Sequence, residues 1–300
     1  MAAIDVANLR KRYGDVPAVD DVSFTVATGE VFALLGPNGA GKTTTVEILE
    51  GYRTAGGGEV SVLGFDPARG GIEFRDRIGI VLQETGIDAQ LTVTESLDLY
   101  GSFYSRRRPA GELVELVGLD EKAEARVKTL SGGQRRRLDL ALALIGDPDI
   151  VFLDEPTTGF DPSARRKAWQ LVENLADLGK TILLTTHYLD EAQNLADHIA
   201  VLGRGRIIAE GTPETLVSGA TASTISFLLP DEIPSGDLPR IGSGTSVRSD
   251  RVEIISVDPT RDVHALTGWA LDRGLSLDSL AVARPSLEDI YLGIIEDDDP

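Results

Sequence analysis

Three largely apolar runs of four to six residues stand out in the first two thirds of the chain. They lie at residues 31–35, 150–153 and 181–186. Such runs are typical of strands buried on both faces of a sheet. Apolar residues at helical spacing follow each run, at residues 43–51, 164–178 and 189–196. Strands that alternate with helices predict an α/β fold built on a parallel sheet.

The pattern changes in two other parts of this region. Residues 4–9 and 22–26 predict short strands with polar breaks between them. From Thr92 to about Leu142 the apolar spacing becomes helical, and Thr92 followed by Glu95 is typical of a capped helix start. We therefore expect a strand-rich beginning and a helical insert beside the parallel sheet.

Composition shifts near Ser218, and residues 219–250 are rich in glycine, serine, threonine and proline. Strands are predicted at residues 224–229, 252–257 and 277–283, and a helix at 260–273. We expect one domain over residues 1–218 and a small α+β accessory domain over 219–300. The accessory domain ends in an acidic tail that is typical of solvated chain.

The charge balance excludes some classes of partner. The formal net charge is −19, whereas binding to nucleic acid depends on clustered lysine and arginine. The same charge opposes free adsorption to an anionic membrane. The sequence has no cysteine, and no apolar run approaches the roughly 18–20 residues of a membrane-spanning helix.

A glycine-rich segment connects the first buried strand to its helix, and it has the spacing of a phosphate-binding loop. Free backbone N–H groups and the helix dipole favour an anion at such a helix start. Lys42 could reach the β- and γ-phosphates, and the Thr43 hydroxyl could bind Mg²⁺. The alternative is a glycine-rich turn that binds nothing. The segment is Gly36-Pro37-Asn38-Gly39-Ala40-Gly41-Lys42-Thr43-Thr44.

Two carboxylates follow the apolar run at residues 150–153. Asp154 is placed to hold Mg²⁺ through water, and Glu155 to polarise an attacking water as general base. The alternative for this pair is a turn or cap that serves the next helix. The preceding strand and the distance of about 110 residues from the phosphate loop favour the catalytic interpretation.

A second glycine turn precedes a predicted helix, at Ser131-Gly132-Gly133-Gln134. By the same dipole argument it is a candidate anion site. Its alternative is a plain capping box.

These motifs together resemble those of the ABC ATPases. Leu130 to Gln134 resembles the signature sequence, and it lies between the phosphate loop and Leu153-Asp154-Glu155-Pro156. Four further residues occupy the order expected of the family. They are Tyr13 as the aromatic that stacks on adenine, Gln83 of the Q-loop, Asp161 of the D-loop and His187 of the switch loop. The resemblance covers about residues 4–216.

The resemblance implies a P-loop NTPase with a RecA-like core, an antiparallel β subdomain and a helical signature subdomain over about residues 84–142. It implies ATP and Mg²⁺ as cofactors, with Thr43, Gln83 and Asp154 at the metal. Two such subunits would pack head to tail, so that Ser131–Gln134 of one meets the ATP held by Lys42 of the other. Asp161 would act across that interface, and His187 would hold the γ-phosphate and water.

Residues 284–292 resemble a sequence near the end of drug- and antibiotic-exporting ABC ATPases, and their alternative is an amphipathic helix that closes the accessory domain. The resemblance implies an ATPase subunit that powers export of a drug, antibiotic or lipid-like substrate. It would sit on the cytoplasmic face of the membrane through a separate integral-membrane permease, without nucleic acid. The competing class is a non-transport ABC ATPase acting on ribosome or DNA. A GTPase or small-molecule kinase leaves Ser131–Gln134 and His187 unexplained.

Overall fold

A computed structural model describes residues 2–81, 86–218, 222–229, 233–234, 237–248 and 250–283. The chain divides into two compact units, Met1–Pro213 and Glu214–Pro300, which are described separately. The expectations for Gln83, for residues 284–292 and for the acidic tail lie outside the described residues.

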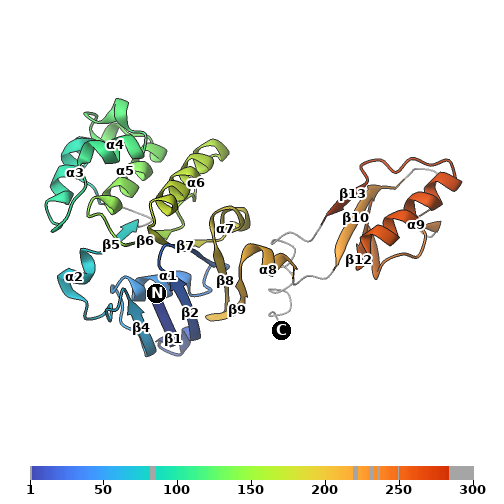
Figure 1. Cartoon of the computed structure of the whole chain (residues 1–300), viewed down its shortest axis with the longest axis horizontal. Helices are drawn as coiled ribbons and strands as arrows, with labels where there is room; N and C mark the ends of the chain where they lie inside the picture. Colours follow the sequence, from blue (N-terminus) through green and yellow to red (C-terminus); the bar gives the residue numbers. More distant parts are fainter. Residues whose placement is uncertain are drawn as a thin grey trace. The chain divides into compact units, whose positions relative to one another are not determined.

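The first unit is organised around a largely parallel sheet (Figure 1). Its strand order is β5-β6-β7-β3-β8-β9, and β9 runs antiparallel to β8. All residues of β3 and β7 are buried, the three threonines of β7 included. The strands are β3 (Val31–Leu35), β5 (Ile78–Val81), β6 (Ile150–Asp154), β7 (Thr181–Thr186), β8 (His198–Gly203) and β9 (Arg206–Gly211).

Helices connect these strands. Helix α1 (Lys42–Leu49) follows β3, α6 (Pro162–Asp177) follows β6, and α7 (Leu189–Leu195) follows β7. Helix α6 begins two residues earlier than predicted, because Asp161 caps it and Pro162 is preorganised for the first turn. The short helices α2 (Gly71–Arg75) and α8 (Pro213–Ser218) were not predicted.

An antiparallel sheet of order β2-β1-β4 accompanies the parallel one. It contains β1 (Ala2–Tyr13), β2 (Val16–Ala27) and β4 (Gly57–Val62). The prediction of short strands at 4–9 and 22–26 was wrong in length. The polar residues Asn8 and Asp21 adopt positive φ angles of 51° and 66° where the register shifts, so bulges absorb the breaks and the strands continue.

The helical insert contains α3 (Val93–Gly101), α4 (Ala110–Leu116) and α5 (Gly132–Leu144), which Figure 1 shows grouped together. The predicted start of α3 is confirmed, because the Thr92 hydroxyl accepts from the Glu95 N–H and the Glu95 carboxylate accepts from the Thr92 N–H. Helix α5 packs on β5 and thereby joins the insert to the parallel sheet.

The second unit is a small α+β domain. Its sheet has the order β11-β12-β10-β13, and helix α9 (Pro259–Asp272) packs on it through Leu266. The strand predicted at 277–283 is shorter than expected, and β11 was not predicted because its sequence is polar and begins with glycine. The strands are β10 (Ser223–Leu228), β11 (Gly244–Arg248), β12 (Arg251–Ser256) and β13 (Ala281–Ala283).

None of the helices in the described ranges combines the length and apolarity needed to span a bilayer.

A buried acid, Glu50, lies directly after α1 and is only 6 % exposed. Burial raises its pKa to about 8, and the negative charges of Asp154 and Glu47 act in the same direction. The neutral carboxylic acid is therefore the form that the folded chain accommodates.

This buried acid makes the stability of the fold depend on pH. Between about pH 5 and 8 the folded chain binds more protons at Glu50 than the unfolded chain does, so the free energy of unfolding falls as pH rises, by on the order of 3 kcal/mol. Glu50→Gln removes this titration and raises stability at pH 8. Urea unfolding of both proteins from pH 5 to 8.5 measures the difference, with exposed Glu59→Gln as control. Equal pH slopes for Glu50→Gln and wild type would contradict the assignment.

Candidate active site

The strands β6, β7 and β3 lie side by side and run in the same direction. Their carboxyl ends therefore meet at one edge of the sheet. The phosphate loop follows β3, Glu155 follows β6 and His187 follows β7. Parallel pairing thus brings together three segments, of which the first and the last lie more than 100 residues apart along the chain.

Residues 36–41 connect β3 to α1 as a tight turn. Gly39 and Gly41 have positive φ angles of 83° and 103°, which glycine adopts readily. A Cβ atom on Gly41 would lie 2.4 Å from the carbonyl oxygen of Ala18, and one on Gly36 would lie 2.5 Å from that of Leu202. Close backbone approach therefore requires glycine at both positions. No side chain caps α1, so its first N–H groups are available to an anion.

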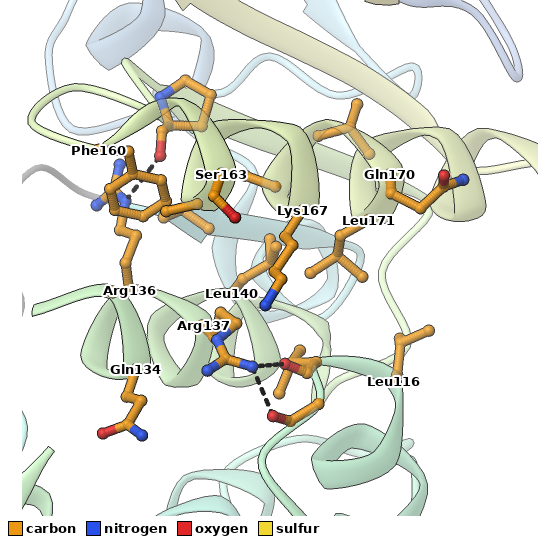
Figure 2. A pocket seen from close by; sticks show the side chains of 18 of the residues that line it. Leu116, Gln134, Arg136, Arg137, Leu140, Phe160, Ser163, Lys167, Gln170 and Leu171 are labelled. Atoms are coloured by element: carbon orange, nitrogen blue, oxygen red, sulfur yellow. Dashed lines mark hydrogen bonds between the residues drawn. The ribbon is translucent and has the colours of Figure 1, made fainter. Parts of the chain in front are cut away.

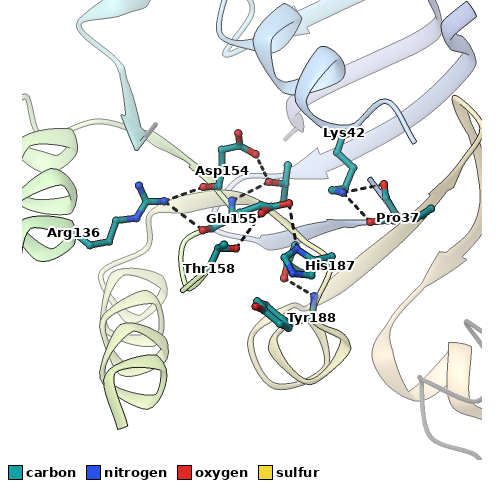
Figure 3. A network of polar contacts seen from close by, with 11 residues as sticks. Pro37, Lys42, Arg136, Asp154, Glu155, Thr158, His187 and Tyr188 are labelled. Atoms are coloured by element: carbon teal, nitrogen blue, oxygen red, sulfur yellow. Dashed lines mark hydrogen bonds and ion pairs between the residues drawn. The ribbon is translucent and has the colours of Figure 1, made fainter. Parts of the chain in front are cut away.

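Lys42 is buried at the start of α1. Its ammonium group donates to the carbonyl oxygens of Gly36 at 2.8 Å and Pro37 at 3.2 Å (Figure 3). Burial lowers the pKa of Lys42, whereas the charges of Glu155 and Asp154 oppose that shift. The side chain thus lies back across its own loop, facing two carboxylates.

The hydroxyl groups of Thr43 and Thr44 come next on α1. Thr43 is exposed and Thr44 is half-buried. Asp154, the last residue of β6, accepts a hydrogen bond from the Thr185 hydroxyl of the neighbouring strand β7, with which it is in register. A hydroxyl and a carboxylate are the oxygen ligands that Mg²⁺ prefers in phosphate-loop proteins. Among the described residues, no three acidic, histidine or cysteine side chains cluster as a metal site.

Glu155 has an unusual backbone conformation and a well-defined side chain. Its φ angle is +46°, a left-handed value that costs a non-glycine residue about 1–3 kcal/mol. One carboxylate oxygen accepts from the Thr158 hydroxyl at 3.0 Å, and the other lies 3.2 Å from His187 Nδ1 (Figure 3). The chain holds this acid in place at the expense of local strain, a pattern found at functional sites.

His187 is about one third exposed and packs against the ring of Tyr188, with 4.1 Å between ring centroids. Its Nδ1 atom is close to Glu155, yet within the described residues the two do not meet the angles of a hydrogen bond. The imidazole is therefore near the acid and remains able to bond a further group.

The second glycine turn lies elsewhere. Ser131 caps α5, and its hydroxyl accepts from the Gln134 N–H while the Gln134 amide oxygen accepts from the Ser131 N–H, so the capping box is present. Asp161 caps α6 by accepting from two backbone N–H groups. Ser131, Gly133, Gln134 and Asp161 line a cavity of about 850 Å³ between α5 and α6, shown in Figure 2, to which the phosphate loop does not contribute.

Two other predicted residues are not joined to this group. Tyr13 ends β1, is exposed, and has the cationic groups of Lys11 and Arg53 over its ring at 5.8 and 5.5 Å. Gln83 is outside the described residues. The structure thus gathers Lys42, Asp154, Glu155 and His187, and it leaves Ser131–Gln134, Asp161 and Tyr13 outside their direct contacts.

Sequence reasoning missed Thr185 and Thr158, which hold the two acids. Thr185 also accepts a hydrogen bond from the Glu155 N–H at 3.0 Å. The only signal was the position of Thr185 at the end of a buried strand, beside the predicted His187.

Comparison with known proteins identifies the family. The model of a family described as ABC transporter matches residues 19–158, and that of an ABC transporter domain-containing protein-like C-terminal domain matches residues 223–286. The chain is 42 % identical to the Nod factor export ATP-binding protein I of Rhizobium meliloti (strain 1021), over 97 % of this chain and 87 % of that protein. It is 39 % identical to the daunorubicin resistance ATP-binding protein DrrA3 of Streptomyces coeruleorubidus, over 99 % of this chain and 96 % of that protein.

Solved structures give the same result for the fold. An ATP-binding subunit of an ABC transporter superposes with a TM-score of 0.65 at 28 % identity, over 72 % of this chain and 92 % of that one. A dimeric ATP-binding cassette in a post-hydrolysis state with ADP and Pi superposes with a TM-score of 0.62 at 26 % identity. The superposition covers 70 % of this chain and 98 % of that one. The predicted P-loop NTPase fold is confirmed, and this chain belongs to the ATP-binding ATPase proteins of the ABC transporter family.

Proposed function

We propose that this chain is the ATPase subunit that powers an exporter, with its permease in a separate polypeptide. The observation that carries the proposal is the convergence of Lys42, Asp154, Glu155 and His187 at the carboxyl edge of the parallel sheet. The names of the relatives support export, because one is a Nod factor export protein and another a daunorubicin resistance protein. The substrate class that we propose is a drug, antibiotic or lipid-like molecule.

Binding of ATP starts at the phosphate loop. Backbone N–H groups of the phosphate loop and the uncapped start of α1 bind phosphate oxygens, and Lys42 exchanges the carbonyl oxygens of Gly36 and Pro37 for the β- and γ-phosphates. The Thr43 hydroxyl and the Asp154 carboxylate would hold Mg²⁺, which neutralises charge that develops on the phosphates. By the resemblance to the family, Tyr13 would stack on adenine, and Gln83 would serve the metal and the attacking water.

Hydrolysis follows by in-line attack of water on the γ-phosphorus. The Glu155 carboxylate accepts a proton from the water, the bond between the γ-phosphorus and the bridging oxygen breaks, and ADP and phosphate leave. His187, beside Glu155, donates a hydrogen bond to the γ-phosphate. The hydrogen bonds from Thr158 and Thr185 keep the two acids oriented before substrate arrives.

A second subunit completes the site. The position of Ser131–Gln134 on a cavity away from Lys42 supports a head-to-tail dimer, in which each signature turn faces the partner's ATP. A related cassette is dimeric, and the second subunit here is another copy or a paralogue. Residues 1–218 form the nucleotide-binding domain and residues 219–300 the accessory domain. The assembly lies on the inner face of the membrane through the permease, without nucleic acid.

The transport assignment is tested by co-expression with a candidate permease, chosen from any neighbouring gene that encodes about six apolar spans. We expect the two to co-purify in detergent, and the ATPase rate in lipid vesicles to change with members of a panel of drugs and lipids. Recovery of the chain with ribosomes alone would contradict the assignment.

Lys42→Ala should abolish ATP binding and ATP-dependent dimerisation together, because the same nucleotide joins both halves of the site. Binding of a fluorescent ATP analogue and light scattering with ATP measure the two effects. Exposed Lys122→Ala is the control of equal charge. Dimerisation of Lys42→Ala with ATP at the wild-type level would exclude the shared site.

Glu155→Gln should lower the hydrolysis rate about 10²–10⁴-fold, which corresponds to roughly 3–5 kcal/mol in barrier height, since the amide cannot accept the proton. ATP binding should remain. Steady-state phosphate release and ATP affinity separate the two steps, with exposed Glu121→Gln as control. Turnover at the wild-type rate would show that Glu155 is not the base.

A further inference from the structure

The backbone around Glu155 is held from two sides. On the side of β7, the Glu155 N–H donates to the carbonyl oxygen of Thr185 at 3.2 Å and to its hydroxyl at 3.0 Å. On the other side lies the guanidinium group of Arg136, which comes from α5 in the helical insert (Figure 3). The backbone of Glu155, with its left-handed φ angle, is therefore fixed by hydrogen bonds from two sides.

Arg136 contacts the carbonyl oxygens of three consecutive residues. Its Nη2 atom donates to Asp154 at 2.9 Å and to Glu155 at 3.4 Å, and its Nε atom donates to Pro156 at 3.4 Å. A planar guanidinium has several N–H donors in a fixed fork, so one side chain can bond the carbonyl oxygens of three consecutive residues at once. A lysine ammonium is a compact point charge without this fork and does not reproduce the arrangement.

The charge of Arg136 is retained in this position. Burial lowers its pKa, and the nearby carboxylates of Asp139, Asp154 and Glu191 oppose that shift. Because arginine is the most basic side chain in proteins, the group stays protonated at neutral pH. Its hydrogen bonds to the carbonyl oxygens are therefore charge-assisted.

Helix α5 links Arg136 to the second glycine turn. Arg136 follows Ser131, the cap of α5, by five residues, a rise of about 7.5 Å along the helix. A continuous helix moves as one piece, so a displacement of its first turn is passed to Arg136 and from there to residues 154–156.

We propose that Arg136 is a positioning residue that orients the Glu155 carboxylate and ties that orientation to the position of the α5 N-terminus. The inference rests on the proposed function, in which Glu155 is the general base and α5 begins at the partner's nucleotide. Engagement of the signature turn by the partner's ATP then sets the geometry of the chain's own catalytic acid.

If Arg136 only stabilised the fold, its loss would affect stability and activity in the same way as loss of a neighbouring arginine. Arg137 provides that comparison. Its Nη1 atom donates to the carbonyl oxygens of Val117 at 3.0 Å and Gly118 at 2.5 Å. The two bonds are the dashed lines at Arg137 in Figure 2. Both arginines thus lie on α5 and bind backbone carbonyls, but only Arg136 reaches the segment that carries Glu155.

The test compares Arg136→Gln, Arg136→Lys and the matched control Arg137→Gln in the full chain with its permease. We expect Arg136→Gln to lower kcat about 10–100-fold, because an error of about 1 Å in a reacting group costs that much. The dissociation constant for ATP should change less than about threefold. Arg136→Lys should recover the melting temperature with only part of the rate. Arg137→Gln should lower the melting temperature as much as Arg136→Gln and keep kcat within about threefold of wild type.

A double-mutant cycle with Glu155→Gln decides between direct and indirect action. If Arg136 acts through Glu155, Arg136→Gln should not slow the residual phosphate release of Glu155→Gln any further. An equal loss of kcat in Arg136→Gln and Arg137→Gln, or a further equal loss in the Glu155→Gln background, would overturn the inference. Wild-type turnover of Glu155→Gln would instead refute the base assignment under the proposed function. If Arg136→Gln does not fold, the same cycle is built with Arg136→Lys.

Discussion

Parallel pairing of β7 with both β6 and β3 brings the phosphate loop, the acid pair Asp154 and Glu155, and His187 to one edge of the sheet. The register matters as much as the direction. Asp154 stands opposite Thr185, so the hydroxyl of one strand end orients the carboxylate of the next. A shift of one residue in this pairing would turn the Asp154 side chain to the other face of the sheet. The chemistry thus depends on the same hydrogen-bond ladder that builds the core.

Electrostatics explains why this edge can hold so many ionisable groups. Lys42 is buried, which disfavours its charge, but Asp154 and Glu155 stabilise the ammonium form. Glu50, at the other end of α1, has acidic neighbours that oppose its ionisation, and its pKa rises to about 8. The two ends of one short helix therefore carry buried ionisable groups on which acidic neighbours act in opposite ways. The carboxylates of Asp154 and Glu155 favour the charged form of Lys42, whereas Asp154 and Glu47 favour the neutral form of Glu50.

The two glycine turns of the chain, before α1 and before α5, differ in how their backbone N–H groups are satisfied. The loop before α1 has no side-chain cap and leaves its N–H groups to a ligand. The turn before α5 is closed by Ser131 and Gln134, which satisfy each other's backbone groups. Its glycines are nevertheless open, since a Cβ atom on Gly132 or Gly133 would meet nothing within 4 Å. The first turn thus leaves backbone N–H groups without a side-chain cap, whereas the second is capped and has open space beside its glycines.

By itself the sequence determined the glycine loop, the buried strands with Asp154 and His187 at their ends, and the cap at Thr92. Each of these depends on local spacing, backbone conformation or strand periodicity, which a short segment specifies. Tertiary structure decided the length of β1 and β2, because the bulges at Asn8 and Asp21 form only between paired strands. It also decided the contacts of Arg136 and Thr185, which join residues 18 to 31 positions apart. Nothing in the local sequence of Arg136, within the triplet Arg135-Arg136-Arg137, or of Thr185, within a strand, predicts which residue it bonds. Only packing of α5 and β7 against the end of β6 brings those groups within bonding distance.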